Sequence, residues 1–180
     1  MDKAGEDRLA EPGDGLLHPV ALGSLAMLIV NDHALKSAYP GVVTGKLSDV
    51  AGLVFFPLLL VAGLELIQAI RRRWRGPSGA ASEIAVVATG LAFAAVKLLP
   101  VGAHAFGWSL GLAQWLASVP VDLVTGRGVS PLAAAASVAD PTDLLALPAL
   151  LVPLWLGRRR AAQVDRNAQV PGVRQAVETG

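Results

Sequence analysis

Three short polar clusters and one isolated lysine stand beside the most apolar stretches of this chain. Asn31-Asp32-His33 lies at the end of the first apolar run, residues 46–49 lie at the start of the second, and residues 140–143 lie at the start of the last. The ionisable members are Asp32, His33, Lys36, Lys46, Asp49, Lys97, Asp140 and Asp143. Charged groups at membrane depth are costly, and those that persist mark ion pathways, proton relays or substrate sites. These residues form the candidate site, and the leading chemistry is binding or transport of an ion or small solute.

Two other functions remain open from the same residues. The lysines are suited to hold a phosphate while His33 or Asp49 acts as a general base, which would make the chain a membrane enzyme acting on a lipid-linked or periplasmic substrate. Alternatively, the charges form pairs that only fix helix packing, as in an accessory or interaction protein. The sequence has no His-Glu-x-x-His, and we assign no catalytic residue, metal site or cofactor.

The composition is typical of an integral membrane protein. Of the 180 residues, 53% are hydrophobic and 16% are charged, whereas soluble domains carry about 25% charged residues. The mean hydropathy is +0.54. Without cysteine there is no disulfide, no thiolate metal site and no cysteine nucleophile. Because the arginines gather at the ends of apolar segments, we expect no nucleic-acid partner.

Four apolar segments approach the ~17 to 25 residues that cross a bilayer as a helix. They cover about residues 16–35, 48–70, 83–100 and 141–157. Residues 1–15 are a polar tail without the positive leader of a signal peptide, and residues 158–180 form a second polar tail. We therefore predict an all-α membrane protein with a four-helix domain over residues 16–157.

Residues 106–119 have helical periodicity, and Pro120 is predicted to end that helix. Some fourteen residues span only about 21 Å, which is short of the ~30 Å hydrocarbon core. We predict an outer-face interfacial or re-entrant helix, followed by another short helix from Ser130-Pro131. Gly107 and Gly111 form a small-xxx-small pair that permits close helix approach.

The basic residues give the orientation. Arg71–Arg75 follows the second segment and Arg158–Arg160 follows the last, and positive clusters stay in the cytoplasm. The prediction is a multi-pass protein of the bacterial plasma membrane with both termini cytoplasmic. A fifth crossing is the alternative, and it would put the two arginine clusters on opposite sides. The expected partners are the lipid bilayer and a second copy or another membrane protein.

This orientation places Lys97, Asp143 and Asp32 at similar depths, roughly 20 to 24 Å from the cytoplasmic ends of their helices. Lys97 is expected to pair with Asp143 first and Asp32 second, or to extend its side chain to the outer interface.

Other polar residues have structural interpretations. Asp140 and Asp143 fit an N-terminal helix cap, and Ser48-Asp49 fits the start of the second helix. Glu65 is expected to reach toward Arg71 and Arg72.

Three motifs resemble those of a family of small bacterial polytopic membrane proteins. They are N-D-H-x-L-K from Asn31 to Lys36, T-G-K-L-S-D-x-A-G-L from Thr44 to Leu53, and D-P-T-D-L from Asp140 to Leu144. The resemblance covers about half of the chain. It implies the membrane fold and brings no activity, cofactor or residue role.

Overall fold

The computed structural model describes residues 10–35, 38, 41–126, 128–129, 131–135 and 140–168, without the side chains of residues 32, 33, 42, 165, 167 and 168. Over these ranges every regular element is a helix, and there is no β-strand. The all-α prediction is confirmed for this part of the chain. The chain divides into two compact units, residues 1–90 with 146–180 and residues 91–145.

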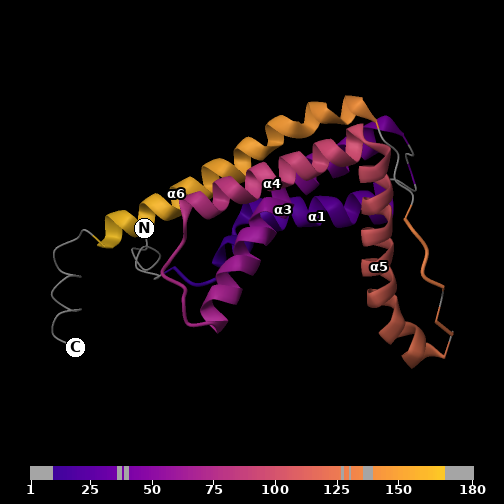
Figure 1. Cartoon of the computed structure of the whole chain (residues 1–180), viewed down its shortest axis with the longest axis horizontal. Helices are drawn as coiled ribbons and strands as arrows, with labels where there is room; N and C mark the ends of the chain where they lie inside the picture. Colours follow the sequence, from indigo (N-terminus) through magenta and orange to yellow (C-terminus); the bar gives the residue numbers. More distant parts are fainter. Residues whose placement is uncertain are drawn as a thin grey trace. The chain divides into compact units, whose positions relative to one another are not determined.

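The first unit is built on helix α3 (Val42–Ile70), which contacts α1 (Pro19–Val30), the short helix η2 (Asp14–Leu17) and α6 (Leu151–Ala168). Figure 1 shows α1 lying along α3. Ala21, Leu58 and Leu156 form a small buried core where α1, α3 and α6 meet. Helix α1 begins at Pro19, because proline suits the first position of a helix. His18 caps the helix, since its Nδ1 accepts a hydrogen bond from Val20 N at 3.2 Å.

Helix α3 begins at Val42, earlier than the predicted start near residue 48. Its N-cap is Gly41, and Thr44 Oγ1 donates to the Gly41 carbonyl at 2.8 Å. No proline interrupts residues 42–48, so the helix extends back through the polar residues. The prediction that Ser48-Asp49 opens this helix is therefore wrong, because both residues lie inside it.

Helix α4 covers Gly79–Leu98, and Ser78 Oγ caps it by accepting from Ala81 N at 3.3 Å. Helix α5 covers Pro100–Thr125 and runs through Pro120 without ending. The prediction that Pro120 stops the helix is wrong. A proline removes one backbone hydrogen bond, and the apolar turns on both sides continue the helix until Gly126, which has a φ of 69° and forms the left-handed cap.

Residues 131–135 are extended, where we had predicted a short helix. This segment lies against α5, and Ala135 N donates to the Gly107 carbonyl at 2.9 Å. A Cβ at Gly107 would stand 2.6 Å from Ala135 O, and one at Gly111 would collide with Ala133 O. The two glycines therefore make room for extended backbone rather than for a second helix.

The last segment begins as a 3-10 helix, η4 (Pro141–Leu150), and continues as α6 to Ala168. Helical structure thus continues past residue 157 into the predicted tail. Residues 169–180 of that tail lie outside the described part.

Two helices of the described residues, Val43–Ile70 in α3 and Gly79–Leu98 in α4, are long and apolar enough to cross a membrane. Helix α1 is apolar but shorter. Length and composition alone support this interpretation.

Candidate functional site

The residues of the candidate site belong to both compact units. Asp32, His33, Lys46 and Asp49 belong to the first, and Lys97, Asp140 and Asp143 belong to the second. We therefore describe the two groups separately. Lys36 and the side chains of Asp32 and His33 lie outside the described residues.

Lys97 and Asp143 form an ion pair in the second unit. Lys97 Nζ donates to Asp143 Oδ2 at 2.6 Å, and the two side chains are 15% and 13% exposed. The ammonium group also stands 5.4 Å from the centroid of the Phe93 ring, one helical turn earlier. The predicted first partner of Lys97 is confirmed, and the lysine does not extend alone to an interface.

Helix ends position this pair. Lys97 occupies the last turn of α4, where the helix dipole favours a cation. Asp140 caps η4 through its Oδ1, which accepts from Thr142 N at 2.9 Å, and Asp143 lies in the first turn of that helix. The predicted capping role of Asp140 is confirmed. The carboxylate of Asp143 thus meets two favourable charges, the amino end of its own helix and the ammonium of Lys97.

Asn31 is the central residue of the polar group in the first unit, although we assigned it no role from the sequence. Its side chain is fully buried, and Nδ2 donates to Thr44 O at 2.7 Å and to Ser48 Oγ at 2.6 Å. The Thr44 carbonyl only accepts, so the amide nitrogen must face it and the oxygen must point away. Asn31 Oδ1 is buried and, among the described residues, has no hydrogen-bond partner.

The backbone at Asn31 is also unusual. Residues Asn31–Leu35 form a π-helical turn, η3, at the end of α1. Such turns are rare and occur often at functional sites. Asp32 and His33 lie within this turn, while Lys46 and Asp49 lie in the first two turns of α3 and are half-buried. The sequence signal for this site was the polar cluster Asn31-Asp32-His33 at the end of an apolar run.

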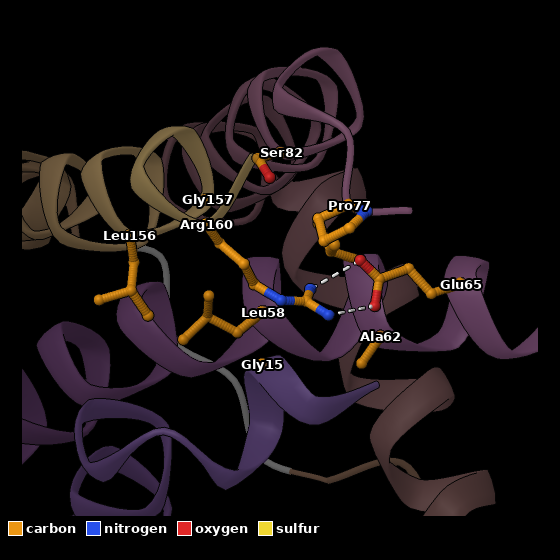
Figure 2. Close-up of a pocket in the computed structure, with 10 residues that line it drawn as sticks. Gly15, Leu58, Ala62, Glu65, Pro77, Ser82, Leu156, Gly157 and Arg160 are labelled. Carbon is orange, nitrogen blue, oxygen red and sulfur yellow. Dashed lines mark hydrogen bonds and ion pairs between the residues drawn. The ribbon is translucent and has the colours of Figure 1, made fainter. Parts of the chain in front are cut away.

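Three consecutive arginines of α6 point to different partners, as their spacing of about 100° per residue requires. Arg158 pairs with the exposed Glu83 of α4 at 2.9 Å, and Arg159 stacks on Trp155 at 4.4 Å from the ring centroid. Arg160 turns inward and holds Glu65 of α3 with two bonds of 2.7 and 3.1 Å. Figure 2 shows this guanidinium lying between the two helices.

Arg160 also ties the N-terminal segment to the helices. It pairs with the Asp14 carboxylate and donates to the Glu11 carbonyl at 3.0 Å, while Gly13 N donates to Glu65 Oε2 at 2.9 Å. Glu65 is only 3% exposed. Our prediction that Glu65 reaches toward Arg71 and Arg72 is wrong, because its side chain faces α6 and is already satisfied there.

A cavity of about 20 Å³, measured as space for the centre of a water-sized sphere, lies beside Arg160, Glu65 and Ser82. This volume holds about one water molecule. Among the described side chains, no three histidines or carboxylates gather as a metal site.

Comparison with known proteins finds no matching family model, no matching curated protein and no matching solved structure.

Proposed function

We propose that this chain is a polytopic protein of the bacterial plasma membrane that binds an ion or small donor-bearing solute beside Asn31. Four crossings with both termini cytoplasmic belong to this proposal, as does membership of the family that its three motifs resemble. The membrane location is supported by α4, of which only 17% of the apolar window is buried. A core helix of a soluble protein would be mostly buried, so the exposed apolar surface of α4 fits contact with lipid.

The binding site rests on one observation, the buried Asn31 Oδ1, which has no partner in the part of the chain that the structure describes. A buried acceptor left unsatisfied costs about 1 to 3 kcal/mol, and a bound water, ion or ligand is one of its ordinary explanations. An amide oxygen is a hard ligand suited to a small cation or to a hydrogen-bond donor. The π-helical turn that carries Asp32 and His33 begins at this residue, so acidic and titratable groups follow it directly in the chain.

Thermal unfolding of the protein in phosphatidylcholine nanodiscs tests this site. The ligand series is Li⁺, Na⁺, K⁺ and methylammonium, with choline as the bulky control cation. We expect one of the small cations to raise the unfolding temperature with saturation, because a ligand at a hundred times its Kd stabilises the folded state by about 2.7 kcal/mol.

Asn31→Leu removes the amide oxygen at similar volume and is expected to abolish this response. Ser24→Ala is the matched control, since Ser24 is the polar side chain of α1 and its hydroxyl donates to the backbone carbonyls of Val20 and Ala21. A response that is equal in wild type and Asn31→Leu, or absent for all the cations, would contradict the proposed site.

The second candidate function is an accessory or interaction protein whose charge pairs only specify packing. It is favoured by the Lys97–Asp143 pair, in which each charge is compensated by the other at 2.6 Å. A double-mutant cycle on this pair, described in the Discussion, measures that structural role. An ion response at Asn31 together with a strongly coupled Lys97–Asp143 pair would assign binding to the first site and packing to the second.

A further inference from the structure

The exposed arginines at the end of α3 do not join the ion pairs of the first unit. Arg160 and Arg158 use Glu65, Asp14 and Glu83 as partners. Within the described residues no carboxylate pairs with the arginine surface, which we define as Arg71, Arg72, Arg73, Arg75 and Arg159. All five residues are exposed. Among the described residues, Glu65, Asp14 and Glu83 are therefore taken by Arg158 and Arg160, and the positive charge of the arginine surface faces solvent, where an anionic partner can reach it.

The α3–α4 connection, which carries four of these arginines, packs beside α6, which carries the fifth (Figure 1). A Cβ at Gly76 would lie 3.8 Å from Val164, and one at Gly79 would lie 3.9 Å from Ala161. The positive charge is thus concentrated on one region rather than spread along the chain.

Exposed apolar side chains come directly before the arginine surface on both helices. On α3, Ile67 is 50% and Ile70 is 75% exposed, and Arg71 follows. On α6, Trp155 is 53% exposed and stacks under Arg159. Apolar side chains followed by aromatic and cationic ones are typical of the membrane interface, where the acyl chains meet the lipid headgroups.

The backbone of Arg72 has an unusual conformation for an arginine. It ends α3 in the left-handed conformation, with a φ of 54°. Arg72 N donates to Ala69 O at 2.9 Å and Arg73 N donates to Gln68 O at 2.8 Å, which is the Schellman pattern. Glycine is the usual residue at this position because a side chain is disfavoured there. The chain retains an arginine at a position that penalises it, which suggests a use for that guanidinium.

We infer that the arginine surface binds the phosphate headgroups of anionic phospholipids in the cytoplasmic leaflet. The guanidinium groups donate paired hydrogen bonds to phosphate oxygens, while Trp155 and the isoleucines contact the acyl region beneath. This inference uses the membrane location of the proposed function and does not depend on the Asn31 site.

The test compares the unfolding temperature of the full chain in phosphatidylcholine nanodiscs with that in nanodiscs containing increasing phosphatidylglycerol, and with that in phosphatidylcholine plus inorganic phosphate. We expect phosphatidylglycerol to raise the unfolding temperature in the wild type, and phosphate alone to leave it unchanged. Equal unfolding temperatures in the two lipids would overturn the inference. A shift reproduced by inorganic phosphate would overturn the lipid as the occupant.

Two variants locate the site. Arg71→Gln with Arg73→Gln should weaken the apparent affinity for phosphatidylglycerol about 25-fold, at about fivefold for each arginine. Arg72→Gly should weaken it about fivefold, yet leave the unfolding temperature in phosphatidylcholine equal or higher, because glycine relieves the left-handed cap. Opposite effects on binding and stability exclude a mere folding defect.

Arg166→Gln on α6 is the matched control, since Arg166 is exposed but lies two helical turns beyond the arginine surface. It should respond to phosphatidylglycerol like the wild type. Variants of the arginine surface that also keep the full response would refute the inference. The proposed function is tested by other measurements. A protein that does not reconstitute into neutral lipid would contradict the membrane location, and a cation response that Asn31→Leu does not change would contradict the Asn31 site.

Discussion

The Lys97–Asp143 pair predicts a specific pattern of stabilities. Lys97→Met removes the ammonium that holds the Asp143 carboxylate, which is 13% exposed, and Asp143→Asn removes the carboxylate that holds the Lys97 ammonium, which is 15% exposed. A single substitution therefore removes this attraction and leaves the other charge in a largely desolvated place, whereas the double variant removes both charges. Breaking a buried pair is costly, while replacing both partners is often neutral.

The magnitude follows from the geometry. At 2.6 Å and an effective dielectric constant near 20, the attraction is about 6 kcal/mol, and most of it is offset by the desolvation of the two ions. Fully buried pairs lose about 3 to 5 kcal/mol when one partner is removed. Because both side chains keep some contact with solvent, we expect about 2 kcal/mol for each single change, about 1 kcal/mol for the double change and a coupling of about 3 kcal/mol.

The assay is thermal unfolding of the purified protein, followed by the fluorescence of its four tryptophans. About 2 kcal/mol corresponds to a drop of roughly 4 to 8 °C in the unfolding temperature of a chain of this size. The exposed pair Arg158–Glu83, whose side chains are 59% and 49% exposed, is the matched control. The corresponding cycle on that pair should give a coupling below about 1 kcal/mol. Equal couplings for the two pairs, or a double variant as unstable as the sum of the singles, would refute the reasoning.

Two further substitutions, each with a control substitution, test the packing. Arg160→Met should lower the unfolding free energy by about 2 to 4 kcal/mol, because it removes the cation from the buried carboxylate of Glu65. It should also speed proteolysis of the N-terminal segment. In the control, Arg159→Met, the unfolding free energy and the proteolysis rate should not change measurably. Gly111→Ala should cost about 1 to 3 kcal/mol in thermal unfolding, because its Cβ collides with Ala133 O. Gly23→Ala, with nothing within 4 Å of its Cβ inside α1, should instead stabilise by up to ~1 kcal/mol. Equal effects of the two alanines would contradict the close approach at Gly111.

Local sequence patterns predicted part of this protein well. Apolar runs of sufficient length gave helices, and the capping residue Asp140 and the Lys97–Asp143 pair were both predicted. These features depend on a single segment, or on the general rule that a charge next to an apolar helix needs a partner. Helix starts were predicted less well. Helix α3 extends back to Val42 because backbone hydrogen bonding continues through polar residues that contain no proline.

The partners of Glu65 and Asn31 followed from tertiary structure alone. Nothing local links Glu65 to Arg160, which lies 95 residues away, and the nearer Arg71 and Arg72 were the natural sequence-based choice. Asn31 could be recognised as polar from the sequence, but its burial and its unpaired Oδ1 depend on where α3 places Thr44 and Ser48.

The sequence by itself determined the helical class, the apolar segments and the residue types at their ends, since each is a property of consecutive residues. The tertiary structure decided which charges neutralise one another and which remain exposed. Three adjacent arginines show the difference, because the helical twist sends Arg158, Arg159 and Arg160 in three directions and only the packing of α3 and α4 provides two of them with a carboxylate.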